Sequence, residues 1–423
     1  MLRVNENSTH FESMDGKPFF YLADTSWASF GNVPIDAWEP YLRYRKAQNF
    51  NALQISVLPI IHDRSVGPGL IEPFAESSDG GYDLSQRNDA YFDKAEEMVR
   101  LAVEYGFVPV LGLLWLCYAI ERDEPNPYRM TLDEVRAYTS YVVERFAAYD
   151  PVYFVAGDTQ QREEEIGHYL ACLETARSIS PDSLYTHHIA GRRVLDERLR
   201  DDIDFYMYQS GHGADSQSAG RDLAKQFLAL PRKPILNAEP CYEGHGRMRS
   251  EATDSNRFTA FDVRRATWQS LLAGAAVGIT YGGQGVWSGH MSGMRLLAEK
   301  RKYEAYDWEW SYNLDGAWDV GYVKWVWENF DLFGVSPSSI VANAIRPDDP
   351  EVVSATDPGM TRVVAYAPYT TSLRVDLDLS DYTCSVINPA DRRVWNPTVS
   401  FGAVSTVQCP QFNHDMLFLA IKR

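Results

Sequence analysis

Eight short apolar runs recur along the N-terminal two thirds of the chain, and stretches with helical periodicity separate most of them. The runs mostly lack strict alternation of apolar and polar residues, as strands buried on both faces do. They are Phe19–Trp27, Phe50–Pro59, Phe107–Trp115, Val152–Asp158, Leu184–Ile189, Ile203–Ser210, Pro234–Glu239 and Val277–Gly282. Strands that alternate with helices in this way predict an α/β fold, the (β/α)₈ or TIM barrel.

Helical patterns fall in the intervals between these runs. Thr131 is a candidate N-cap, with Glu134 at the capping-box position. The expected helices are Ile35–Gln48, Ala90–Tyr105, the segment that begins after Thr131, Glu164–Ser178 and Phe258–Ala273. Ile60–Asp89 and Gly213–Ala219 are expected to be loops, and loops at the rim of a barrel set specificity.

The character of the chain changes after about residue 335, where short β-rich segments alternate with turns. These segments are Val352–Ala355, Thr361–Tyr366, Ser372–Leu377, Thr383–Ile387 and Met416–Ile421. We therefore expect a catalytic barrel over residues 1–334 and a small antiparallel β-sandwich over residues 335–423.

Charge limits the classes of partner, and the N-terminal sequence bears on location. The net charge of -18 repels nucleic acid and anionic membranes, so neither is expected as a partner. Met1–Asn7 is not followed by an apolar segment of the signal-peptide kind, which favours a cytoplasmic location. No apolar run reaches the roughly 18 residues that cross a bilayer.

The five cysteines are scattered and form no CxxC pair. This distribution gives no signal for zinc or for thioredoxin-type chemistry, and it favours reduced thiols. A bond between Cys384 and Cys409 stays open.

The active site of such a barrel lies at the carboxyl ends of its strands. Acids, aromatic rings and amides gather at these ends. Such groups suit a sugar, because its C–H faces stack on rings and its hydroxyls need donors and acceptors. The candidate substrate-binding residues are Asp24, Trp27, His62, Trp115, His188, Gln209, His212, Tyr242, Tyr281 and Trp287, and Asp63 and His187 stand beside two of them.

Two carboxyl groups are needed to cleave a glycosidic bond. Asp158 ends the fourth run, and Glu239 ends the seventh, directly before Pro240. We take these two as the catalytic pair and expect a raised pKa for Asp158. Glu243 is an alternative acid, and Asp24 is either a sugar ligand or a structural acceptor.

Metal and cofactor signals are weak. The rim histidines with Asp24 and Asp158 could surround a cation, but no HxH pattern follows the first run. The chain has neither a GxGxxG after its first run nor a GxxxxGK[ST] pattern. We expect no cofactor and no catalytic metal.

Several of these segments resemble, in the same order, the apiosidase-like glycoside hydrolases. The opening Asp15-Gly16-Lys17-Pro18-Phe19-Phe20-Tyr21-Leu22-Ala23-Asp24-Thr25-Ser26-Trp27 carries the resemblance. So do Gly157-Asp158, Gln209-Ser210-Gly211-His212, Asn237-Ala238-Glu239-Pro240-Cys241-Tyr242-Glu243 and Thr280-Tyr281-Gly282-Gly283 with Trp287. The resemblance implies a barrel of the clan A type, followed by a small β-domain. It also implies Asp158 as acid/base and Glu239 as nucleophile.

Gly157-Asp158 stands where that clan usually has Asn-Glu. Retaining and inverting mechanisms therefore both stay open, although retention is the main hypothesis. The sequence favours a glycosidase that acts on short oligosaccharides or glycosides, with apiose-containing pectic side chains as the precedent in the family. The alternatives are a non-catalytic carbohydrate-binding barrel and a metal-dependent barrel hydrolase.

Overall fold

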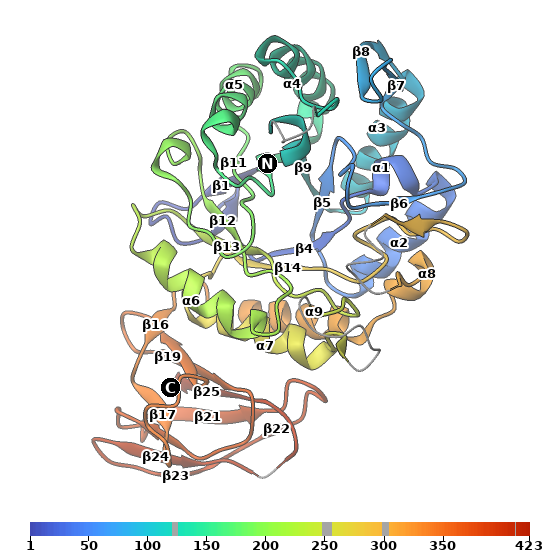
Figure 1. Cartoon of the computed structure of the whole chain (residues 1–423). Helices are drawn as coiled ribbons and strands as arrows, with labels where there is room; N and C mark the ends of the chain where they lie inside the picture. Colours follow the sequence, from blue (N-terminus) through green and yellow to red (C-terminus); the bar gives the residue numbers. More distant parts are fainter. Residues whose placement is uncertain (121–125, 248–255, 298–303, 411) are drawn as a thin grey trace.

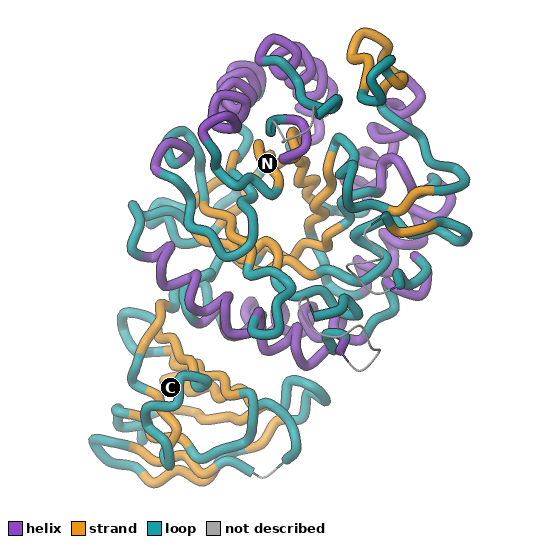
Figure 2. Tube along the Cα trace, viewed as in Figure 1, coloured by secondary structure: helices purple, strands orange, loops and turns teal. Residues whose placement is uncertain are grey.

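The computed structural model describes residues 1–423 apart from 121–125, 248–255, 298–303 and 411 (Figure 1). Eight parallel strands form one sheet in the order β11-β10-β9-β5-β4-β14-β13-β12. A parallel bridge from His188 to Met207 links the two end strands, so the sheet closes into the ring seen in Figure 2. Each of the eight predicted runs contains one of these strands, and the predicted barrel is confirmed. Their bounds are β4 (Tyr21–Thr25), β5 (Ala52–Ser56), β9 (Val108–Trp115), β10 (Val152–Gly157), β11 (Tyr185–Thr186), β12 (Tyr206–Gln209), β13 (Ile235–Glu239) and β14 (Gly278–Tyr281).

Helices surround the barrel where the periodicity predicts them. Thr131 caps its helix as expected: its hydroxyl accepts from the backbone N–H of Glu134, whose carboxylate accepts from the backbone N–H of Thr131. After β11 there is a single 3₁₀ turn, η3 (Glu197–Leu199). The main helices are α2 (Ile35–Ala47), α3 (Asp89–Glu104), α4 (Leu132–Phe146), α5 (Glu163–Ile179), α6 (Ser216–Leu228), α7 (Ala260–Leu272) and α9 (Asp315–Asn329).

The two expected loops contain regular structure. The long segment after β5 forms β6 (Ser65–Val66), β7 (Phe74–Glu76) and β8 (Tyr82–Arg87). β6 pairs with β15 (Arg295–Leu296), which joins this segment to the loop after β14. The prediction of a loop over Gly213–Ala219 is wrong from Ser216 onward, because α6 begins there.

The N-terminal strands close the end of the barrel opposite the carboxyl ends. β1 (Leu2–Val4), β2 (Phe11–Ser13) and β3 (Pro18–Phe19) form an antiparallel sheet. The ring of Phe11 contacts Tyr21, which begins β4, and Phe205, which precedes β12. This end is therefore filled with apolar side chains, and a polar site is expected at the carboxyl ends of the strands.

The C-terminal strands form two antiparallel sheets, so the predicted β-sandwich is confirmed. The larger sheet has the order β16-β18-β19-β25-β21-β22, and the smaller has β17-β20-β24-β23. Their bounds are β16 (Ser336–Ser338), β17 (Val341–Asn343), β18 (Val353–Thr356), β19 (Arg362–Ala367), β20 (Leu373–Val375), β21 (Tyr382–Ile387), β22 (Val394–Trp395), β23 (Thr398–Ser400), β24 (Ser405–Gln408) and β25 (Met416–Lys422). All five cysteines lie in described segments, and none forms a disulfide. In the described part of the chain, no helix combines the length and apolarity that a membrane crossing requires.

Alternation along β19 binds the sandwich to the barrel. Val363 and Ala365 face the core between the two sheets, whereas Val364 and Tyr366 join the core of the barrel. The ring of Tyr366 stacks on Trp268 of α7 with 6.3 Å between the centroids. The sandwich therefore shares an apolar interface with the barrel below α7 (Figure 1).

A buried arginine lies at the centre of this interface. Arg264 of α7 donates to Asp319 of α9 at 2.6 Å and to both carboxylate oxygens of Asp415, which precedes β25, at 2.8 and 3.0 Å. Burial raises the pKa of Asp319 to about 6, although Arg264 opposes the shift. One guanidinium thus binds two carboxylates from different parts of the fold.

We expect Arg264→Ala to lower the free energy of unfolding by about 3–5 kcal/mol, because two carboxylates would stay buried without their cation. Urea-induced unfolding of the full chain measures this loss. Arg265→Ala is the matched control: its pair with Glu351 is partly exposed, so a loss below ~1 kcal/mol is expected. Equal losses in the two variants would contradict the assignment.

Candidate active site

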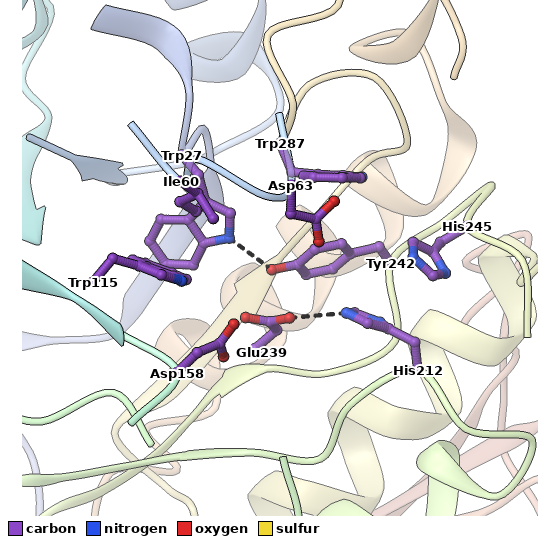
Figure 3. A pocket seen from close by; sticks show the side chains of 10 residues that line it. All are labelled: Trp27, Ile60, Asp63, Trp115, Asp158, His212, Glu239, Tyr242, His245 and Trp287. Atoms are coloured by element: carbon purple, nitrogen blue, oxygen red, sulfur yellow. Dashed lines mark hydrogen bonds and ion pairs between the residues drawn. The ribbon is translucent and has the colours of Figure 1, made fainter. Parts of the chain in front are cut away.

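A pocket of about 310 Å³ opens at the carboxyl ends of the barrel strands (Figure 3). Both predicted catalytic carboxylates line it, together with five of the predicted substrate-binding residues and three others. The lining residues are Trp27, Ile60, Asp63, Trp115, Asp158, His212, Glu239, Tyr242, His245 and Trp287. Residues from seven different stretches of the chain thus meet in one small cavity.

Glu239 is the last residue of β13, and two histidines hold its carboxylate. One oxygen accepts from His212 Nε2 at 2.8 Å, and the other lies 3.3 Å from His188 Nε2. Burial by itself would raise the pKa of Glu239, but the two histidines outweigh it and the pKa is lowered. Glu239 is therefore ionised throughout the neutral range.

Asp158 follows β10 in a left-handed backbone conformation, with φ of 52°. Aspartate tolerates this conformation better than most residues, and such positions cluster at functional sites. The preceding residue has to be glycine, because a Cβ at Gly157 would overlap the ring of Trp115. The turn directs Asp158 into the pocket, where 32% of its side chain is exposed.

His188 lies behind both carboxylates and is fully buried. Its Nδ1 is 4.0 Å from an oxygen of Asp158. Burial opposes the cationic form, but Glu239 and Asp158 together raise the pKa of His188. The neighbouring His187 points the other way, toward Tyr169 of α5, and burial lowers its pKa to about 3. The two rings face opposite sides, as successive residues of a strand do.

Aromatic rings form the walls of the pocket. The rings of Trp27 and Trp115 meet edge to face with 5.3 Å between their centroids. Trp27 Nε1 donates to the hydroxyl of Tyr242 at 3.1 Å. On the other side, the ring of His212 lies 4.4 Å from both Tyr242 and His245. These flat surfaces can stack on the C–H faces of a sugar.

The prediction of Asp24 as a substrate ligand is wrong. Its side chain points out of the barrel, is fully buried, and accepts at 2.6 Å from both Tyr41 and Arg45 of α2. Burial raises the pKa of Asp24 in spite of Arg45. Asp24 therefore has the structural role that the sequence left as its alternative.

Tyr281 and Glu243 also lie outside the pocket. Tyr281 is buried beside Arg45 and donates to Glu243 at 2.7 Å. The same oxygen of Glu243 accepts at 2.9 Å from the backbone N–H of Gly316 at the start of α9. Glu243 thus fastens the loop after β13 to α9, and the geometry excludes it as the alternative acid.

Three further predicted ligands, Gln209, His62 and His188, do not line the pocket, and His188 lies behind the two carboxylates instead. The register of β12 shifts between Tyr208 and Gln209, and such a bulge changes the direction of the side chains that follow it. Gln209 lies beside Gly191 instead. His62 is exposed on the loop after β5.

Ile60, Asp63 and His245 line the pocket and were not predicted to. The sequence placed Asp63 at the rim, but its neighbour His62 was the predicted ligand. A backbone bond from Asp63 to Ile60 shows why both face the pocket: they flank one turn. A similar bond joins His245 to Tyr242. Both turns become visible only in the tertiary structure.

Comparison with known proteins agrees with the fold. Residues 5–334 match the family described as "Apiosidase-like, catalytic domain". A solved glycoside hydrolase is similar over 100% of this chain and 96% of its own, with 20% identity and a TM-score of 0.82. A family 5 glycoside hydrolase from Bacteroides vulgatus is similar over 100% and 92%, with 19% identity and a TM-score of 0.80. No curated protein matches the chain.

The buried Glu243 predicts a pH effect on stability. Burial raises its pKa to about 7, against an ordinary value of 4.5, so the folded chain holds this proton more tightly than the unfolded chain. This group therefore stabilises the fold at low pH, and that contribution declines as the pH rises from about 4.5 to 7. Glu243→Gln lacks this titration. The melting temperature of the variant relative to that of the wild type should therefore rise as the pH increases from about 4.5 to 7. A difference between variant and wild type that stays constant with pH would contradict this prediction.

Proposed function

The chain belongs to the apiosidase-like family of glycoside hydrolases, and we propose that it is a retaining glycosidase with Glu239 as nucleophile and Asp158 as acid/base. One observation carries the proposal: an oxygen of Asp158 and an oxygen of Glu239 lie within 4.8 Å of each other in the rim pocket. Retaining enzymes hold their carboxyl groups about 5–5.5 Å apart, whereas inverting enzymes need about 6.5–9.5 Å for a water molecule.

In the first step, Asp158 donates its proton to the glycosidic oxygen while a Glu239 oxygen attacks the anomeric carbon. The C–O bond to the leaving group breaks, and a covalent glycosyl ester forms. The lowered pKa of Glu239 supports this role, because the nucleophile has to be ionised. The partial exposure of Asp158 suits a residue that exchanges its proton with a leaving alcohol.

In the second step, Asp158 takes a proton from water as the oxygen of that water attacks the anomeric carbon. The ester bond breaks, and Glu239 leaves as a carboxylate. His212 and His188 stabilise the returning charge, since both lie within 3.3 Å of the carboxylate oxygens. The two steps together retain the configuration of the sugar.

The size of the pocket supports action on chain ends or on small glycosides. The ten lining residues leave a space of about 310 Å³, part of which is open to solvent. This space suits one sugar unit rather than a polysaccharide that passes through. Apiosides from pectic side chains are the first substrates to test.

A specific observation favours a second candidate, a metal-dependent hydrolase. Asp158, His188 and Glu239 each offer a ligand atom, and these atoms lie within 4.8 Å of one another. Under our first proposal, dialysis against a chelator leaves kcat unchanged. Loss of activity that Zn²⁺ or Mn²⁺ restores, with metal found in the purified protein, would favour the second candidate instead.

Substitution of the two carboxylates tests the main proposal. We expect Glu239→Ala to abolish hydrolysis of aryl glycosides and Asp158→Asn to lower kcat about 10²–10⁴-fold on substrates with poor leaving groups. Added azide should rescue both variants, with a product of inverted configuration from Glu239→Ala and of retained configuration from Asp158→Asn. Circular dichroism and melting temperature check the fold, and Glu164→Gln on the exposed surface of α5 is the control. Full activity in either variant would end the proposal.

A further inference from the structure

The pocket contains a third carboxylate, which the proposed chemistry does not use. Asp63 faces the same cavity as Asp158 and Glu239 (Figure 3). We propose that Asp63 determines specificity, by accepting hydrogen bonds from adjacent hydroxyls of a neutral sugar and by excluding uronic acids. This inference rests on the proposed glycosidase function and names the substrate class of that site.

The turn that carries Asp63 is tightly held. The backbone N–H of Asp63 donates to the carbonyl of Ile60 at 3.0 Å. The next residue, Arg64, is buried and forms a two-pronged ion pair with Glu72, at 3.0 and 2.6 Å. The carbonyl of Arg64 accepts from the backbone N–H of Leu297 at 2.9 Å, across the β6–β15 pair.

A second set of bonds ties this turn to the loop that carries Trp287. The side-chain amide of Asn32, the last residue of α1 (Ser29–Asn32), donates to the carbonyls of Ser65 at 2.8 Å, Ser288 at 3.1 Å and Gly289 at 3.2 Å. The Ser65 hydroxyl also bonds to a ring nitrogen of His290 at 2.7 Å. Asp63 and Trp287 are therefore held as a unit, and a site organised in advance loses little entropy when it binds.

The chemistry of a carboxylate decides what Asp63 can recognise. An ionised carboxylate has two oxygens that accept hydrogen bonds, and it donates none. Adjacent sugar hydroxyls supply two donors, and bonds to an ionised acceptor are the stronger kind. The rings of Trp27, Trp115 and Trp287 line the same cavity and can pack on the apolar face of that sugar.

Charge decides what Asp63 rejects. Asp63, Asp158 and Glu239 already place three acids around about 310 Å³. The carboxylate of a uronic acid would be a fourth, and it would take the place of the hydroxyl donors that Asp63 needs. Like charges brought together in a desolvated site repel each other strongly, so Asp63 disfavours the binding of acidic sugars.

A double-mutant cycle tests the hydrogen bonds. The probes are the neutral 4-nitrophenyl pentoside that the wild type hydrolyses fastest and its monodeoxy analogues. In the wild type, removal of one of two adjacent hydroxyls should lower kcat/KM about 10- to 100-fold. Asp63→Ala should show a similar loss on the parent pentoside and no further loss on those analogues.

Asp79→Ala is the matched control, because Asp79 lies on the same segment after β5, is exposed, and accepts hydrogen bonds from its neighbours Ser77 and Gly81. This variant should keep the wild-type ratio of kcat/KM between the parent pentoside and each deoxy analogue. Asp63→Asn, which changes the side chain least, guards against a folding defect, and melting temperatures are compared for every variant. Asp63→Asn should also lower the ratio of kcat/KM on a neutral 4-nitrophenyl hexoside to kcat/KM on the matching uronide.

The proposal is overturned if Asp63→Ala keeps the wild-type ratio between parent and deoxy substrates at every hydroxyl. It is equally overturned if the wild type hydrolyses the uronide as well as the neutral hexoside. Calorimetry with the free sugar and the Glu239→Gln variant separates binding from chemistry. A fully active Glu239→Ala enzyme would contradict the proposed function itself. If Glu239→Ala is inactive but the Asp63 variants keep the wild-type ratios of kcat/KM, only this inference is contradicted.

Discussion

A buried carboxylate needs a compensating partner, and in this protein the identity of that partner decides what each carboxylate does. Asp24 is paired with Arg45 and serves the packing of α2 against the barrel. Glu239 is paired with His212 and His188, which keep it charged but leave it facing the pocket. A guanidinium in their place would bind both carboxylate oxygens, and under our proposal it would leave Glu239 poorly available for attack.

The pocket depends on loops that are far apart in the sequence. Asn32 joins the loop after β5 to the loop after β14, and Glu243 joins the loop after β13 to α9. These bonds lie outside the cavity, yet they set the positions of Asp63 and Trp287 within it. Much of the polar structure around the barrel thus serves to hold its rim rigid, which a preorganised site requires.

The sandwich packs beside this rigid framework through α7 and α9, away from the pocket lining. Arg264 reaches from α7 to Asp319 and Asp415, so the charge of one helix residue stabilises both the helix layer and the sandwich. The same helix packs on β14, and the hydroxyl of its Ser270 accepts from the side-chain amide of Asn237 in β13 at 3.0 Å. The interface therefore supports the strands that carry Glu239 and precede Trp287.

The sequence by itself determined the barrel, the sandwich and the positions of Asp158 and Glu239 at two strand ends. Strand runs buried on both faces and a capped helix such as the one after Thr131 are local patterns, and Asp158 and Glu239 end two such runs. Only the tertiary structure decided which way the other rim residues face. Asp24 and Tyr281 turn toward Arg45, and a register shift turns Gln209 away. The turn after β5 brings Asp63 into the pocket instead of His62. The reason is physical: a strand end fixes where a residue lies along the barrel, whereas the direction of its side chain follows from partners on helices and loops far away in the chain.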